Sequence, residues 1–412
     1  MANDEMYTVF PRSGMTDAIY RLTPTTGWTL DVALPGTDKT YCMVTWKNKI
    51  LIADNLTAVQ QFDPVAKTLT VLTDAPVVQY LAIHQDRIMA GGGTTHPTRV
   101  LWSEVLEENK WSPNNFLDAQ AGHGGQITAL LGTPWISRDP RFFIFKEGAT
   151  LSYEGTVNEA TSRLVVVSTR RGCRSPKTIW WTPYGAIFLA QDKTVQMIGT
   201  GAGELQDIGY MLKDSLSTIN ADEITNAAAF YHNDLYRLSI AGNLASTNVH
   251  EWLLDLRPQV FPKEINWYGP GTGDFIGAYA FYRDLLLARE VGNMKVWEID
   301  RAEDKFKGMD GLTRVSTATP HKLAVPNDKA TLLEAYGFNG DVESGITFTV
   351  VANDGETTNI KTISGNTTRE VIRPSARIRG HVFQVTATHS ANEECLLESF
   401  FLRAKPIRRQ AE

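Results

Sequence analysis

Residues 172–201 read GCRSPKTIWWTPYGAIFLAQDKTVQMIGTG and contain three short apolar runs. The runs cover 178–181, 186–190 and 194–198, and turn residues at 183–185 and 191–193 separate them. Short apolar runs bounded by Pro, Gly and Asp are typical of β-strands joined by tight turns. The stretch therefore predicts three consecutive strands.

The same pattern recurs along the first 300 residues. A half-apolar strand, a polar turn and a strongly apolar strand repeat at intervals of 38, 54, 45, 48 and 50 residues, marked by Asn48, Asp86, Pro140, Gly185, Asn233 and Arg283. A third strand often follows with an aromatic residue, at Phe62, Trp102, Tyr153, Trp252 and Trp297, and a weaker fourth strand such as 67–72 comes next. Four short strands repeated every 40–50 residues or so predict β-propeller blades, which stack because one small sheet cannot bury both faces alone.

The repeat ends near residue 310. Before it, two strands expected within 18–34 are predicted to pair with the last blade and close the ring, so six blades are favoured and seven is the alternative. After it, alternating Thr-, Val- and Ala-rich strands are expected within 326–341, 345–354, 357–365, 376–390 and 394–405. We therefore predict an all-β chain with a β-propeller at 1–310 and a β-sandwich with a basic, extended tail at 311–412.

Composition excludes several classes of protein. The net charge of −6 disfavours a general nucleic-acid binder, and no run of about 18 apolar residues predicts a membrane span. The first residues, MANDEMYTVF, lack the basic and apolar regions of a secretory signal. Three scattered cysteines, Cys42, Cys173 and Cys395, do not predict a disulfide framework, so a reducing cytoplasm is the expected folding compartment.

Motifs for catalysis are missing. The eight histidines form no metal-binding pair, and the glycine-rich segments 91–97, 122–125 and 199–203 are interpreted as loops. Acids do occur near strand ends, at Asp54, Asp86, Glu154 and Asp255, but their spacing singles out no pair. No catalytic, cofactor-binding or metal-binding residue is therefore predicted, and the protein is not expected to be an enzyme.

Two further features allow a functional and a structural interpretation. Trp180 and Trp181 could stack a sugar or a base, but alternation along a strand sends the two rings to opposite faces, so packing against neighbouring blades is favoured. Arg171 and Arg174 flank Cys173 and could lower the pKa of its thiol. With no histidine partner evident, Cys173 is interpreted as a small buried residue at the entrance to a blade.

The segment around Cys173 resembles the β-propeller tail proteins of short-tailed bacteriophages. In that family a Gly-Cys-x-Ser-Pro-Lys-Ser/Thr-Ile run precedes two strands, and 172–189 is similar to it, with Thr178 in the place of the more usual Ser. The upstream stretches LWSEVLEENKWSPNNF and QITALLGTPWISRDPRFFIFKEGATLSYEG resemble two further segments through Ser103, Trp111, Phe116, Ile127, Leu130, Phe143, Phe145, Lys146 and Gly155. The closing segment from Arg373, which ends in a strand and an arginine pair, is similar as well.

The resemblance implies a structural role in a virion. It implies a tail hub, nozzle or tail-tube component that forms a ring, commonly six-fold, below the portal and adaptor proteins and passes viral DNA through its lumen. Tail fibre or spike proteins are further implied partners, and the protein is expected in the virion tail after synthesis in the bacterial cytoplasm. The family offers no catalytic residues to carry over.

The C-terminal tail is the predicted assembly contact. Arg403, Lys405, Arg408 and Arg409 are basic in an otherwise acidic chain, and they are expected to reach an acidic surface on a neighbouring subunit or on the adaptor. The alternative function left open is a carbohydrate-binding or carbohydrate-active propeller, which would require carboxylates that converge on the central channel.

Overall fold

The computed structural model describes residues 6–12, 15–23, 27–37, 39–120, 123–132, 141–158, 162–199, 204–272, 276–282, 285–290, 296–299, 316–318, 323–324, 330–340, 346–352, 357–363, 370–372, 379–380, 382–389 and 396–406. It divides into two compact units. Unit 1 comprises Met1–Asn233 and Ala241–Thr247, and unit 2 comprises Asp234–Ile240 and Asn248–Glu412. The domain boundary expected at residues 310 and 311 lies outside the described residues.

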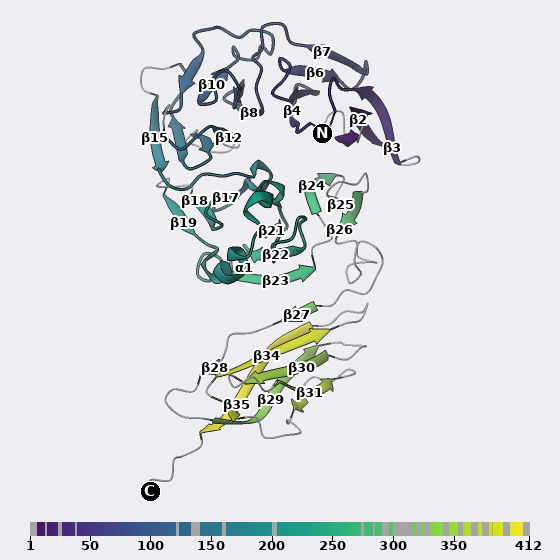
Figure 1. The fold of residues 1–412 in the computed structure, drawn as a ribbon, viewed down its shortest axis with the longest axis vertical. Helices are drawn as coiled ribbons and strands as arrows, with labels where there is room; N and C mark the ends of the chain where they lie inside the picture. Colours follow the sequence, from purple (N-terminus) through teal and green to yellow (C-terminus); the bar gives the residue numbers. More distant parts are fainter. Residues whose placement is uncertain are drawn as a thin grey trace. The chain divides into compact units, whose positions relative to one another are not determined.

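Unit 1 consists of short antiparallel sheets that follow one another along the chain (Figure 1). The first has three strands: β1 (Tyr7–Arg12), β2 (Met15–Thr23) and β3 (Gly27–Ala33). The next two have four strands each: β4 (Cys42–Trp46), β5 (Lys49–Ala53), β6 (Gln60–Asp63) and β7 (Thr68–Val71), then β8 (Tyr80–His84), β9 (Arg87–Gly91), β10 (Arg99–Trp102) and β11 (Phe116–Asp118).

Two more four-stranded sheets follow in the same unit. They are β12 (Ile127–Gly132), β13 (Arg141–Lys146), β14 (Thr150–Glu154) and β15 (Arg163–Ser168), then β16 (Trp180–Thr182), β17 (Gly185–Leu189), β18 (Val195–Gly199) and β19 (Leu205–Asp207). The described helical segments are short: η1 (Pro176–Thr178), η2 (Tyr210–Leu212), α1 (Lys213–Ser217) and η3 (Ala221–Asn226). Strand β20 (Ala228–His232) completes unit 1.

Tight turns that need a positive φ join the first two strands of several sheets. Asn48 lies between β4 and β5 with φ 62°, and Asp86 lies between β8 and β9 with φ 56°. Asn and Asp tolerate this left-handed region better than other non-glycine residues, because their short polar side chains can bond locally. The turns predicted at these positions are confirmed.

Adjacent residues of each central strand face two different neighbouring sheets. In β5, Ile50 and Ile52 pack with Tyr7 of β1, whereas Leu51 packs with Ile88 of the following sheet. In β13, the alternation divides four bulky side chains in the same way: Phe142 and Ile144 join the core with the preceding sheet, and Phe143 and Phe145 join the core with the following one. The sheets of β5 and β13 are thus covered on both faces by their sequence neighbours.

The first strands of the sheets lie innermost. Strand β8 contacts β4 and β12, and β16 contacts β20, so first strand meets first strand from sheet to sheet. The fourth strands are the exposed ones: β7, β11 and β15 show half-buried and exposed residues throughout. Stacked four-stranded antiparallel sheets with this inside-to-outside order are the packing of a β-propeller.

Unit 2 continues the pattern and then changes it. Its first described strands are β21 (Leu235–Ile240), β22 (His250–Asp255) and β23 (Asn266–Thr272), which form a sheet in the order β20-β21-β22-β23, and then β24 (Ile276–Tyr282), β25 (Leu285–Glu290) and β26 (Val296–Ile299), which form a three-stranded sheet. The described strands up to Ile299 therefore form seven sheets, one more than the six hairpin units counted in the sequence. This count favours the seven-bladed alternative.

The extra sheet is the N-terminal one. The two strands expected within 18–34 pair with each other, and the first of them, β2, also pairs with β1, since Ile19 lies opposite both Val9 and Val32. Their expected pairing with the last blade is not among the ladders of the described residues. Closure of the ring by these strands stays a prediction.

The C-terminal residues form two further antiparallel sheets. One runs β27 (Ser316–Ala318), β34 (Val382–His389), β30 (Ile346–Ala352) and β31 (Thr357–Ile363), with β28 (Leu323–Ala324) also on β34. The other runs β32 (Glu370–Ile372), β29 (Ala330–Gly340) and β33 (Arg379–Gly380), with β35 (Leu396–Pro406) also on β29. The five predicted ranges contain β29, β30, β31, β33, β34 and, except for Pro406, β35, and β27, β28 and β32 were not predicted. Two antiparallel sheets of this kind agree with the β-sandwich class.

Candidate functional site

The residues that carry the resemblance, 172–178, form a strap between successive sheets of unit 1. Gly172 lies directly against the β13–β14 turn, where a Cβ atom would overlap the carbonyl oxygen of Lys146. Its own carbonyl accepts from the N–H of Gln191 at 3.0 Å, and the N–H of Cys173 donates to the Lys146 carbonyl at 3.2 Å. Only glycine fits this approach of two main chains, which explains the first residue of the motif.

Cys173 is buried and inert. It is 0% exposed, and its Sγ lies 3.1 Å from the carbonyl oxygen of Ser175. Burial raises the pKa of the Cys173 thiol to about 12, so the flanking arginines do not create a reactive thiolate. The prediction of a small buried residue at this position is confirmed.

Ser175 and Thr178 extend the strap to the next sheets. The Ser175 hydroxyl contacts the carbonyl of Ala227, just before β20, at 2.6 Å. The Thr178 hydroxyl donates to the Ser175 carbonyl at 2.8 Å and accepts from the N–H of Leu189 in β17 at 3.1 Å. Seven residues therefore connect the sheets that contain β13, β17 and β20.

Lys146 forms a second buried tie. Its side chain is 0% exposed, and its ammonium donates to the main-chain carbonyls of Ala119 and Gln120, each at 3.0 Å, and of His123. Three acceptors use all three N–H donors of an ammonium group. Burial lowers the pKa of Lys146, yet the amine is fully engaged in holding the loop after β11 and has no free direction toward a substrate.

The tryptophan pair packs between sheets. Trp181 lies against Phe143, with ring centroids 5.8 Å apart, and its indole N–H donates to the carbonyl of Gly132 at 2.7 Å. Trp180 lies against Phe230 of β20, with centroids 4.5 Å apart. The two rings thus pack against two different sheets, as the packing interpretation expected.

The four acids named from the sequence each have a local role. Asp54 accepts from the N–H groups of Leu56 and Thr57, which closes a turn after β5. Glu154 forms an ion pair with Arg163 at 2.9 Å, and Arg257 at 2.6 Å holds the pKa of Asp255 below its usual range. Asp86 occupies the β8–β9 turn. A general acid needs a raised pKa, and the shift of Asp255 has the opposite direction.

The innermost strands of unit 1 supply no carboxylates either. Strands β4, β8, β12, β16 and β20 read CMVTW, YLAIH, ITALLG, WWT and AAFYH, without a single Asp or Glu. The described part of the chain also contains no cluster of His, Cys, Asp or Glu that could hold a metal ion. The glycine segment at 122–125 is a turn in its described residues, where Gly124 and Gly125 have φ values of 70° and 78° and pack against Ala149 and Glu147.

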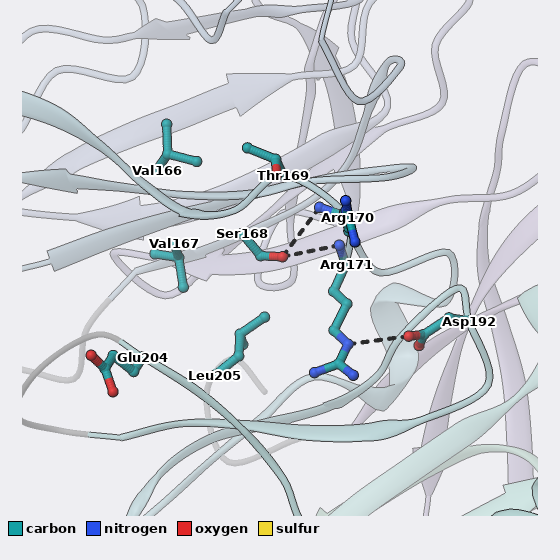
Figure 2. A pocket seen from close by; sticks show the side chains of 9 residues that line it. All are labelled: Val166, Val167, Ser168, Thr169, Arg170, Arg171, Asp192, Glu204 and Leu205. Atoms are coloured by element: carbon teal, nitrogen blue, oxygen red, sulfur yellow. Dashed lines mark hydrogen bonds and ion pairs between the residues drawn. The ribbon is translucent and has the colours of Figure 1, made fainter.

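An open groove of about 700 Å³ runs along the outer edge of two consecutive sheets in unit 1 (Figure 2). Its walls come from the end of β15 and the start of β19, through Val166, Val167, Ser168, Thr169, Arg170, Arg171, Asp192, Glu204 and Leu205. The Ser168 hydroxyl accepts from the N–H groups of Arg170 and Arg171, which turns the chain at the end of β15. The Arg171 guanidinium is fixed by Asp192 at 3.1 Å and Gln196 at 3.1 Å.

The predicted assembly residues lie in two different settings. Arg403 and Lys405 belong to β35, opposite Glu334 and Thr331 of β29, so the expected extended tail begins later than residue 404. Both residues fall within the last strand expected from the sequence, 394–405, and β35 ends one residue later, at Pro406. Arg408 and Arg409 lie outside the described residues.

Lys146 and Ser175 are the residues whose importance sequence reasoning missed. Both were part of the resemblance, but a lysine and a serine on a strand or loop are usually exposed, so their burial had no signal in composition or periodicity. The positions matter because each side chain bonds to main-chain carbonyls of another sheet or loop.

No protein-family model and no curated protein matches the chain. The solved structures that are similar in fold include the following two. The computationally designed Ika8 protein has a TM-score of 0.40 and 14% identity over 71% of this chain and 80% of its own. The Cps50 (Swd1) β-propeller domain of Myceliophteria thermophila has a TM-score of 0.43 and 8% identity over 65% of this chain and 84% of its own. The propeller assignment rests on the sheet order and packing described above.

Among the helices that the structure describes, none has the length and apolar character needed to cross a bilayer.

Proposed function

We propose that the chain is a structural protein of a virus particle, a tail hub or nozzle of a short-tailed bacteriophage. The observation that carries the proposal is the use of the resembling residues. Lys146 and the strap 172–178 tie neighbouring sheets together through buried bonds to main-chain carbonyls. Residues used in this way support a rigid scaffold, and a scaffold is what the resemblance implies.

The chemistry of the described residues supports the same proposal. The candidate thiol is buried, the candidate amine is fully bonded, and the candidate carboxylates are engaged in turns and ion pairs. An enzyme needs a group with a tuned pKa and access to substrate. The alternative of a carbohydrate-active propeller gains no support, because the inner strands of unit 1 lack the carboxylates that such a site would use.

The proposed assembly is a homo-oligomeric ring, six-fold, that docks below the portal and adaptor. A propeller and a sandwich on one chain offer two different surfaces, which favours heterologous contacts between subunits. Such contacts close into rings or continue as filaments. The basic residues of β35 and the end of the chain would meet an acidic neighbour. Viral DNA would pass through the lumen without base-specific contacts, and tail fibres or spikes would bind the outer surface.

Electron microscopy of the purified protein, alone and with tail-less particles of the phage that encodes it, tests the proposal. The expected result is an added ring at the portal vertex, with one symmetry in class averages. Particles that lack the adaptor serve as the control and should remain bare. A protein that stays off the particles in every condition and instead binds or cleaves host glycans would overturn the proposal.

A further inference from the structure

Strand β15 is the longest fourth strand among the four-stranded sheets of unit 1. Strand β15 has six residues, whereas β7 has four and β11 and β19 have three each. Its one described neighbour is β14, so its other side has no strand partner among the residues that the structure describes. Edge strands of this length present unpaired main-chain groups that another extended segment can use.

The side chains of this edge are apolar in the middle and include arginines at both ends, of which Arg163 is paired with Glu154 at 2.9 Å. Residues 164–169 read LVVVST and carry no charge, Arg163 precedes them, and Arg170 and Arg171 follow them. Val166 is 39% exposed, a large fraction for a valine on a strand. Natural edges are usually protected by a charge or a proline within the strand, and β15 has only Arg163, at its first position.

The groove beside β15 gives an added strand room for its side chains. Val166 lines the groove along β15, and Arg170 and Arg171 line it just after the strand ends (Figure 2). Arg171 is already held by Asp192, but no carboxylate is paired with Arg170 in the described part of the chain. Glu204 lies on the opposite wall, so the cationic side of the groove is the one next to β15.

We propose that the β15 edge and its groove bind an extended, acid-flanked segment of a partner protein by β-strand addition. The segment has about four β-branched or apolar residues with carboxylates at both ends. It pairs its main chain with β15, covers Val166, and places a carboxylate beside Arg170. The inference does not rest on the proposed function, since it concerns an edge that neither the strap nor the ring requires.

Charge selects this occupant over a second copy of the chain. Two β15 edges paired antiparallel would align the start of each strand with the end of the other. Arg163 of one copy would then lie near Arg170 of its partner at both ends of the ladder, and like charges at facing positions are destabilising. An added strand with acids at both ends instead places carboxylates opposite the arginines.

The test uses the full chain and a fluorescein-labelled nine-residue peptide, with Thr-Val-Ile-Val-Thr between two glutamates at each end. Fluorescence anisotropy should show saturable binding, weaker in high salt. Two N-methylated peptides probe the main-chain pairing. One carries N-methyl groups on its two valines, and the other carries them on the isoleucine and the second threonine. One of the two should lose binding and the other should keep it, because only one edge of an added strand faces β15.

Protein variants locate the site. Arg170→Glu should weaken binding by about fivefold and favour a peptide with lysines in place of the glutamates. Val166→Asn should weaken binding by about threefold, whereas Val71→Asn, at an exposed position on the outer strand β7, should have no effect. Thermal melts confirm that the variants fold.

Four results would overturn the inference. They are no binding of the glutamate peptide, equal binding of the glutamate and lysine peptides, equal binding of both N-methylated peptides, and an equal effect of Val71→Asn. Light scattering that shows a dimer which Val166→Asn dissociates would assign the edge to a second copy and would also overturn it.

Discussion

Ser175 and Ala227 lie 52 residues apart in the sequence, and the Ser175 hydroxyl donates to the Ala227 carbonyl at 2.6 Å. The same hydroxyl lies 3.2 Å from the carbonyl of Thr225. A buried hydroxyl with two main-chain acceptors fixes the loop before β20 against the strap, so the bond joins parts of the propeller that no strand ladder joins.

Ser175→Ala should lower the free energy of unfolding by about 1–3 kcal/mol, because the buried carbonyl of Ala227 loses its donor. Urea unfolding followed by tryptophan fluorescence measures the change. Ser217→Ala, at an exposed serine whose hydroxyl bonds within α1, is the control and should stay within about 0.5 kcal/mol of the natural chain. Equal losses of unfolding free energy for the two substitutions would mean that the Ser175 bond does not stabilise the strap.

Alkaline pH should destabilise the protein through Cys173. Burial raises the thiol pKa from 9.0 to about 12, so the unfolded state releases this proton first. The stability that the protonated thiol contributes is complete below pH 9 and is lost as pH rises toward 12, at up to about 1.4 kcal/mol per pH unit. Unfolding in guanidinium at pH 8, 9 and 10 should show a shallower loss for Cys173→Ala than for the natural chain. Parallel curves would contradict the assignment.

Acid should destabilise the protein through His84. This side chain is 2% exposed and lies against Phe142, and burial lowers its pKa to about 4. The unfolded state therefore binds a proton at higher pH than the folded state. The contribution is complete above pH 6.5 and is lost as pH falls toward 4, by up to about 1.4 kcal/mol per pH unit.

His84→Leu should flatten the stability curve between pH 6.5 and 4, measured by thermal unfolding in matched buffers. His123→Leu, at an exposed position, is the control and should keep the slope of the natural chain. A steep acid slope that survives in the His84 variant would place its origin elsewhere.

Truncation of the inter-sheet aromatics should be costly. Phe143, Phe188 and Trp252 are 1%, 0% and 7% exposed, and each change to Ala should cost about 3–5 kcal/mol. Val65→Ala, at a position 80% exposed, should cost less than about 0.5 kcal/mol. Chemical denaturation ranks the four variants, and near-wild-type stability of the aromatic variants would mean that the strand register is wrong. The same cost was expected for Trp297, whose side chain lies outside the described residues.

Deletion at the C-terminus should depend on where it begins. Removal of 407–412 should leave the fold intact and weaken docking onto the preceding tail layer in a salt-sensitive way, because Arg408 and Arg409 are lost. Removal of 404–412 also takes three residues from the β29–β35 ladder, Ala404, Lys405 and Pro406, so it should lower stability as well. Thermal melts and particle docking at low and high salt separate the two effects, and docking unaffected by either deletion would remove the tail from the interface.

The propeller was predictable because its turns and its alternation are local. Asn48 and Asp86 mark turns that need a positive φ, and Trp180 and Trp181 follow the two-residue period of a strand. The buried ties were not predictable, since the partners of Lys146 and Ser175 are main-chain carbonyls, which every residue has. The end of the last strand was predicted to within one residue, since the expected strand ends at Lys405 and β35 ends at Pro406.

The alternation seen in β5 and β13 also limits how such a chain can change during descent. Inserting one residue into either strand would send every following side chain to the wrong neighbouring sheet and disturb two interfaces at once. Insertions and deletions should be tolerated better between strands than within these two. Relatives of this protein should therefore differ in loop length more than in the lengths of the strands that match β5 and β13.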